Sequence, residues 1–215
     1  MKKIFGFICI VAILCVACNN NQPEADSSVD STSIVLNTIL TRHSVRAYTA
    51  QPIGADTIQA LLRAAMAAPS GVDVRPWRFV VLTDTAQYDS IFGDNFNLPK
   101  YKNAAAVIVV CGQTTWVPRH SGSEPSAYAE VEPNKNWTAD VAACAENLLL
   151  AAHAYGLGAV WTACYPYEDR MQPVHKALNL PDDVAPFCVI PLGHPAEDVA
   201  PKDKWDTACI HYNRW

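Results

Sequence analysis

Residues 137–164 read WTADVAACAENLLLAAHAYGLGAVWTAC, and this stretch carries the clearest signals about the fold. Its first part, Trp137 to Tyr155, is rich in Ala and Leu and apolar around much of its circumference, which predicts a deeply buried helix. Gly156 stands where a helix C-terminal cap belongs. The apolar run from Ala159 to Cys164 then predicts a strand. A buried helix that leads directly into a strand indicates an α+β core, a sheet covered by helices.

Further helices and strands are predicted on both sides of this stretch. Apolar spacing and flanking breakers predict the following elements: helices at Ile34 to Leu40, Thr57 to Ala68 and Glu168 to Leu178, and strands at Phe79 to Thr83, Ala104 to Cys111 and Phe187 to Leu192.

The segment from Thr114 to Asn136 contains three prolines and few periodic apolar residues, so it is predicted to be a long loop. Long loops in compact domains are often functional. Trp116, Arg119 and Tyr128 are candidates to shape a substrate pocket there, although aromatic residues on a loop surface are also ordinary.

The N-terminus is typical of an export signal. Lys2 and Lys3 precede an apolar run from Ile4 to Ala17 that is too short to span a bilayer comfortably. Small residues before Cys18 indicate a bacterial lipoprotein signal, with Cys18 lipidated, although Cys15 stands where Leu is usual. An ordinary secretory signal is the alternative.

We therefore expect a signal peptide at 1–17, a polar flexible tether at 18–33 and one domain at 34–215. The expected location is the cell envelope, with the membrane contacted only through the lipid on Cys18.

Composition excludes some classes of function. The formal net charge is −5 and the basic residues are scattered, which argues against a nucleic-acid-binding protein. Only 17% of the residues are charged, which fits an oligomer that covers part of its surface. The cysteines of the domain are Cys111, Cys144, Cys164, Cys188 and Cys209. Their odd number and wide spacing argue against a disulfide framework or a metal site, so we interpret them as core residues.

The segment Thr41 to Arg46, TRHSVR, concentrates groups that bind anions. If it is extended, alternate side chains share a face, so Arg42, Ser44 and Arg46 point the same way. Two guanidinium groups beside a hydroxyl suit a phosphate. Taken alone, however, the segment is more typical of a solvated basic turn.

A second segment, Ala67 to Trp77, reads AAPSGVDVRPW and joins a predicted helix to a predicted strand. Its Pro, Ser and Gly residues favour a turn whose backbone approaches a flat ligand closely, although a plain helix-to-strand turn is also possible. Gly156 and Gly158 follow a helix instead of opening one, so they are not a dinucleotide fingerprint. Capping and close packing are sufficient reasons for both glycines.

In their order and spacing these segments resemble the nitroreductase family of flavoproteins, from about Ile34 to the C-terminus. The family's Arg-x-Ser-x-Arg-like segment matches Arg42, Ser44 and Arg46, and its Ala-Pro-Ser-x-x-Asn-x-Gln-Pro-Trp turn matches residues 68–77. Three later matches complete the pattern: the glycine-rich helix end at Tyr155 to Gly158, a Gly-x-Pro break at Gly193 to Pro195, and a late basic pair at Lys202 and Lys204.

The resemblance implies a mixed sheet flanked by helices and a homodimer that holds two FMN molecules at its interface. It further implies ping-pong hydride transfer from NADH, NADPH or another donor to a nitroaromatic, a quinone or another small acceptor. The flavin carries the chemistry, so no protein group is assigned a catalytic role. A membrane-tethered protein that binds flavin or another ligand on the same fold, without turnover, is the alternative.

The residues that the resemblance assigns to cofactor binding are Arg42, His43, Ser44, Arg46, Pro69, Ser70, Gly71, Asp73, Arg75, Gly156, Gly158, Lys202 and Lys204. The resemblance implies that the phosphate is held by Arg42, His43, Ser44, Lys202 and Lys204. Arg46 would lie nearer the flavin ring. The turn at 69–73 would come from the partner subunit. Asp73 and Arg75 replace the family's Asn and Gln, and we expect them to act as a pair that shifts the flavin potential.

Overall fold

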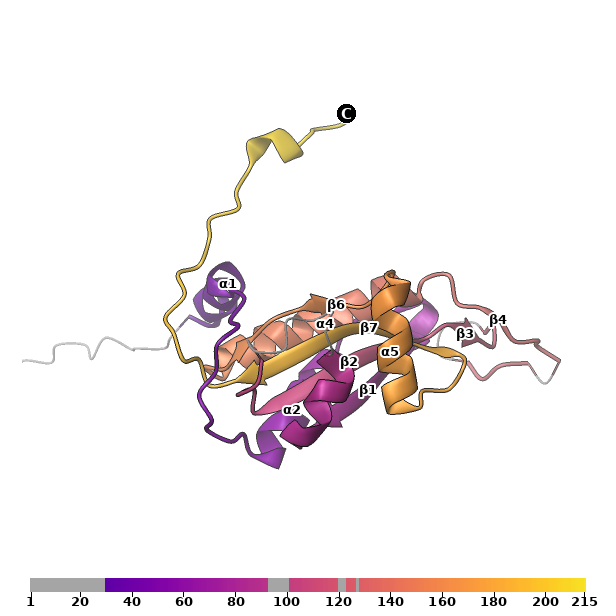
Figure 1. Ribbon diagram of the computed structural model, residues 1–215. Helices are drawn as coiled ribbons and strands as arrows, with labels where there is room; N and C mark the ends of the chain where they lie inside the picture. The colour runs from indigo at the N-terminus through magenta and orange to yellow at the C-terminus, as the bar shows by residue number, and fades with distance from the viewer. Residues whose placement is uncertain (1–29, 93–100, 120–122, 127) are drawn as a thin grey trace, which may run out of the picture.

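The central sheet is antiparallel, and two layers of helices cover its faces (Figure 1). The computed structural model describes residues 30–92, 101–119, 123–126 and 128–215. The sheet has the strand order β1-β2-β7-β5, and β6 also pairs with β7. The strands are β1 (Trp77–Leu82), β2 (Ala106–Gln113), β5 (Gly158–Ala159), β6 (Thr162–Ala163) and β7 (Val184–Gly193).

Strand β2 lies at the centre of the fold and separates two clusters of buried side chains. Ala106, Ile108 and Val110 pack with α2 (Ala55–Met66) and α4 (Trp137–Ala154) on one face. Val107 and Val109 pack on the other face with α3 (Tyr88–Phe92) and α5 (Glu168–Leu178). Successive side chains of a strand point to opposite faces, so a strand that is apolar throughout must be covered on both sides.

The sheet differs in one respect from the expected mixed sheet: every pairing among the described strands is antiparallel. The cause is the course of the chain. Leu82 at the end of β1 pairs with Val107 near the start of β2, and Gln113 at the end of β2 pairs with Val184 at the start of β7. Each connection therefore begins and ends at the same end of the sheet, so the two strands that it joins run in opposite directions.

Most predicted elements are confirmed within a few residues, and α5 coincides with its predicted range. The predicted third strand, 159–164, is instead divided into β5 and β6. The expected long loop contains a small hairpin, β3 (Thr115–Trp116) with β4 (Glu132–Pro133), and α3 was not predicted.

Helix α1 (Ser31–Thr41) starts earlier than the expected domain boundary, because Asp30 accepts a hydrogen bond from Thr32 N and caps the helix. The expected signal peptide and most of the tether lie outside the described residues. Within the part of the chain that is described, no helix is both long enough and apolar enough to cross a membrane.

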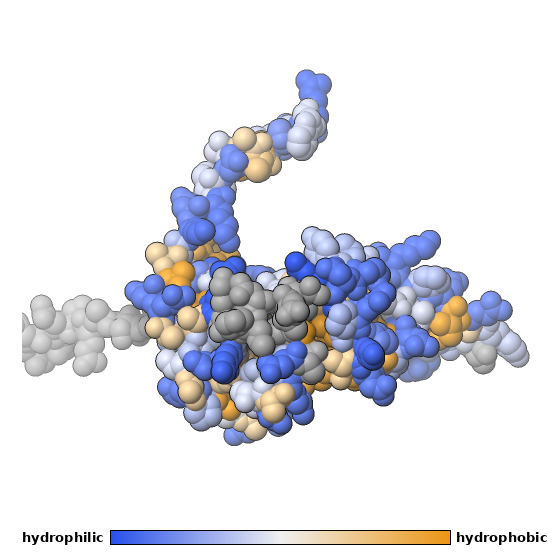
Figure 2. Space-filling view, in the orientation of Figure 1, coloured by the Kyte–Doolittle hydropathy of each residue, from blue (hydrophilic) through white to orange (hydrophobic). Residues whose placement is uncertain are grey.

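Two segments, α1 and the tail, contribute little to the core of their own chain. No residue of α1 is buried, although it carries exposed Ile34, Leu36 and Leu40. The tail beyond Ala200 leaves the body as an extended arm (Figure 1), and Figure 2 shows apolar surface over α1 and at the foot of this arm. The interpretation of Cys209 as a core residue is therefore wrong, since the arm leaves it exposed, whereas the other four cysteines of the domain are buried.

Candidate functional site

The segment that follows α1 is extended and is hydrogen-bonded to β5 and to the residues just after β7. Val45 N donates to Ala159 O of β5 at 3.1 Å. Thr49 N donates to His194 O at 2.9 Å, and Ala196 N donates to Ala47 O at 3.0 Å. The segment thus runs as an added edge beside the end of β7. These hydrogen bonds fix the backbone that carries Arg42 to Arg46.

Val45 anchors this segment to the core. It is 3% exposed and lies over Gly158, whose added Cβ would come within 2.6 Å of Val45 Cβ. The hydroxyl of Tyr48 lies within hydrogen-bonding distance of two carbonyl oxygens, Val45 O at 2.7 Å and Pro191 O at 3.0 Å, and shares its one proton between them. A glycine is therefore required at position 158 because Val45 packs directly against its backbone. A larger residue there would displace Val45 and, with it, the segment that carries the basic side chains.

The basic side chains around Val45 line one cavity of about 350 Å³. The lining consists of Arg42, His43, Ser44, Arg46, Val199, Ala200, Lys202 and Lys204. The structure thus brings together the two predicted basic groups from opposite ends of the chain. Val199 and Ala200 were not predicted, since nothing in their residue type distinguishes them. None of these lining residues is acidic, so the cavity suits an anion.

The turn at residues 69–75 lies elsewhere. Gly71 N donates to Oδ1 of the buried Asp140 at 3.0 Å, which ties the turn to the N-terminal part of α4. The residues of α4 that contact the cavity segment, Glu146 and His153, lie further along the helix. With a rise of about 1.5 Å per residue, the span along the helix from Asp140 is roughly 9 Å to Glu146 and roughly 20 Å to His153. The turn does not line the basic cavity of its own chain.

Asp73 and Arg75 form a close ion pair on this turn. Arg75 Nε donates to Asp73 Oδ1 at 2.7 Å, and Arg75 Nη2 donates to Asp73 Oδ2 at 2.5 Å. The hydrogen bond from Arg75 lowers the pKa of Asp73 below its usual range. Asp73 is therefore ionised at neutral pH, and Arg75 balances its charge.

The backbone of the turn is unusual. Val72, Asp73 and Arg75 all have positive φ angles, of 43°, 57° and 54°, which non-glycine residues rarely adopt. Arg75 N donates to Ser70 Oγ at 3.0 Å, and Arg119 Nη2 donates to Asp73 O at 3.1 Å. These contacts hold the strained conformation. Strained backbone of this kind is concentrated at functional sites.

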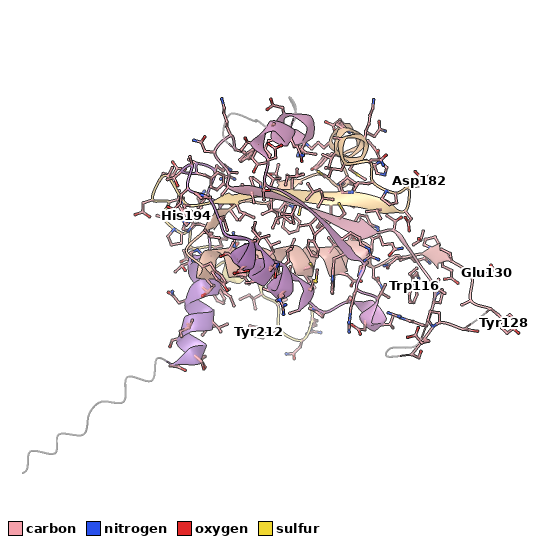
Figure 3. The ribbon with its side chains drawn as sticks, turned by 90° about the horizontal axis from the view of Figure 1, so that it is seen from below. Trp116, Tyr128, Glu130, Asp182, His194 and Tyr212 are labelled. Carbon is pink, nitrogen blue, oxygen red and sulfur yellow. The ribbon has the colours of Figure 1, made fainter. Side chains whose placement is uncertain are left out.

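The remaining candidates are dispersed. Gly156 is an exposed C-terminal cap of α4 with φ +70°, and it does not line the cavity. Figure 3 shows His194 at one end of the molecule, with Trp116 and Tyr128 at the other. Tyr128 is 94% exposed. Arg119 is the loop candidate that contacts the turn, so the loop and the turn belong to one region, which is separate from the basic cavity.

Comparison with known proteins identifies relatives that are named as nitroreductases. The family model described as "Nitroreductase family" matches residues 39–194. A Methanothermobacter thermautotrophicus protein named "Putative NADH dehydrogenase/NAD(P)H nitroreductase" is 37% identical over 181 residues, which is 84% of this chain and 87% of that protein.

Two solved structures are also similar. One, from Bacteroides thetaiotaomicron and of the same name, is 42% identical with a TM-score of 0.73, covering 84% of this chain and 98% of that one. The other, the NADPH:FMN oxidoreductase of Vibrio harveyi in complex with NAD+, is 27% identical with a TM-score of 0.69, covering 85% of this chain and 78% of that one.

Proposed function

The chain belongs to the nitroreductase family of FMN-dependent NAD(P)H oxidoreductases, and from this premise we propose that its basic cavity holds the phosphate of FMN. The observation that carries the proposal is the meeting of Arg42, His43 and Ser44 with Lys202 and Lys204 in one cavity without an acidic lining residue.

The residues fit this ligand. A phosphate monoester carries nearly two negative charges and accepts several hydrogen bonds. Guanidinium, hydroxyl and ammonium donors on an extended backbone meet both needs. Arg46, at the same cavity, would face the ring end of the cofactor, where a cation stabilises the anionic reduced flavin.

The proposed reaction is hydride transfer from NADH, NADPH or another donor to a nitroaromatic, quinone-like or other small acceptor. Bound FMN would supply the redox chemistry, accepting a hydride and passing electrons to the second substrate. The chain's own residues bind the phosphate and orient the ring. The strained turn at 69–75 would line the ring bound by the other subunit, since it does not line the cavity of its own chain.

Purification of the domain, residues 34–215, tests this function. We expect a yellow protein that releases FMN on denaturation and is bleached anaerobically by NADH or NADPH, with colour restored by a panel of acceptors. A colourless domain that ignores added FMN would contradict the proposal and would favour a binding protein without turnover.

The proposed assembly is a homodimer, and the exposed apolar residues support it. Helix α1 and the arm expose Ile34, Val35, Leu36, Ile39, Leu40, Trp205, Tyr212 and Trp215. Covering them on a second copy removes this apolar surface from water. We expect sedimentation equilibrium to give twice the chain mass, and Trp205→Ser/Trp215→Ser to weaken association while leaving the two lysines in place. Tyr167→Ser, at an exposed aromatic at the start of α5, is the matched control and should leave association unchanged.

The ion pair of the turn provides a test of the ring environment. Arg75→Gln is expected to lower the flavin potential, because the unbalanced Asp73 carboxylate would repel the charge of the reduced ring. Asp73→Asn is expected to raise it, because Arg75 would be left unpaired. The double variant should lie near the parent. Potentiometric titration measures the shifts, and an unchanged potential and FMN affinity in both single variants would contradict the idea.

We also propose that the domain is exported to the cell envelope and held there by a lipid on Cys18. This proposal rests on the sequence of residues 1–18. Because reduced nicotinamides are cytoplasmic, export would require another electron donor or a protein that supplies electrons. Membrane recovery of the full chain, and its loss in Cys18→Ser, is the expected result; equal recovery of both chains in the soluble fraction would contradict it.

A further inference from the structure

Glu146 and His153 lie on one side of α4 and contact the segment that leads into the basic cavity, without lining the cavity. Their spacing of seven residues corresponds to about two helical turns, so both side chains project from the same face. Their partners are neighbours in sequence, Arg42 for Glu146 and Thr41 for His153. α4 therefore holds this segment at two points.

The first contact determines which donors of Arg42 remain for a ligand. Arg42 Nε lies 3.2 Å from Glu146 Oε1, and the Arg42 side chain is 15% exposed. A guanidinium has five N–H donors in a rigid plane. The ion pair places the Glu146 carboxylate beside Nε, which orients the plane and leaves the two Nη groups for other partners.

The contacts of Thr41 determine which ring nitrogen of His153 and which of His43 carries a proton. Thr41 Oγ1 donates its proton to Asn37 O at 2.6 Å, so it can only accept from His153 Nε2, which lies 2.8 Å away. His43 Nδ1 lies 2.8 Å from Thr41 O and must donate to it, since a carbonyl only accepts. The Nε2 atom of His43 is then the nitrogen that remains for the cavity, which His43 lines.

His153 is suited to a neutral role as a donor. Burial is the main cause that lowers its pKa, and the nearby His43 and Arg42 lower it further. The His43 and His153 rings meet edge to face with centroids 5.6 Å apart. A neutral His153 with its proton on Nε2 holds Thr41 without adding a positive charge beside Arg42.

We propose that Glu146 and His153 are positioning residues for the FMN phosphate, Glu146 by orienting the Arg42 guanidinium and His153 by fixing Thr41 and, through it, the ring of His43. The inference rests on the proposed function. It goes beyond it by assigning roles to two α4 side chains that do not line the cavity.

The direction in which FMN affinity changes when Glu146 is removed distinguishes a positioning role from a purely electrostatic one. Glu146 is itself an anion and partly neutralises Arg42. If its charge alone mattered, its removal would tighten the binding of an anionic phosphate. Positioning predicts the opposite, because a guanidinium released from Glu146 must be ordered when the ligand binds.

The experiment measures the dissociation constants of FMN and riboflavin, which lacks the phosphate, for the full-length domain and its variants. Glu146→Leu is expected to weaken FMN binding about tenfold with riboflavin unchanged. Glu146→Gln keeps an acceptor for Arg42 Nε and should retain the parent affinity. Glu130→Leu removes one exposed carboxylate at the other end of the molecule (Figure 3) and controls for net charge.

His153 is tested in the same way. His153→Leu should weaken FMN about tenfold relative to riboflavin, and His153→Gln, which retains an N–H donor, should recover most of the loss. The effects of Thr41→Val and His153→Leu should be less than additive, since each removes the same contact.

The outcomes are distinguishable. Parent-like or tighter FMN binding in both leucine variants, or an equal loss of riboflavin binding, would overturn the positioning roles while leaving FMN binding by the family site intact. A parent domain that binds neither ligand would instead overturn the proposed function, and this inference with it.

Discussion

Replacement of Gly158 by alanine should remove most of the FMN affinity and lower the melting temperature of the domain by several degrees. The new Cβ would lie 2.6 Å from Val45 Cβ and Cγ1, and these atoms are too close to the backbone to move freely. Overpacking of this kind costs about 1–3 kcal/mol, and each kcal/mol corresponds to roughly 2–4 °C in a domain of this size. Because Val45 anchors the segment from Arg42 to Arg46, its displacement should move the phosphate-binding donors as well.

Two other glycines provide matched controls for this substitution. Gly156→Ala meets no atom within 4 Å but has φ +70°, so it should cost roughly 1 kcal/mol of stability and leave FMN affinity unchanged. Gly54→Ala meets open space at an ordinary φ but replaces the N-cap glycine of α2, so it should cost up to about 1 kcal/mol of stability and leave FMN affinity unchanged. Thermal unfolding and fluorescence titration with FMN measure both properties. An FMN affinity in Gly158→Ala equal to that of Gly156→Ala would show that the packing of Val45 does not position the site.

Neutralisation of the late basic pair, Lys202→Gln/Lys204→Gln, is expected to weaken FMN binding about 30-fold. Two charge-assisted contacts in a partly exposed cavity contribute roughly 2 kcal/mol together, and 1.4 kcal/mol corresponds to tenfold. Riboflavin affinity should not change, because it has no phosphate. The salt dependence of FMN binding should also become shallower, since fewer exposed charges take part.

The matched control for the lysine pair is Lys176→Gln, an exposed lysine in the last turn of α5 that does not line the cavity. It changes the net charge in the same direction and should leave both affinities at the parent value. Equal FMN affinity in the lysine double variant and the parent would show that the arm does not serve the phosphate.

The sequence predicted the elements whose signals are local. The periodic helix from Trp137, its glycine end and the apolar β2 are recognisable because burial and capping leave their pattern in adjacent residues. The basic segment and the turn at 69–75 were recognisable for the same reason. The division of residues 159–164 into β5 and β6 was not, because it depends on where β7 pairs with each part.

The order and spacing of the residues thus indicate the α+β class, the family resemblance and the residues that carry charge toward a ligand. The folded structure was needed to show that Lys202 and Lys204 meet Arg42 in one cavity, and that Glu146 and His153 support the cavity segment. These are contacts between residues that lie far apart in the sequence. Their energies depend on distance and orientation in the folded chain, and neither is encoded in the spacing of neighbouring residues.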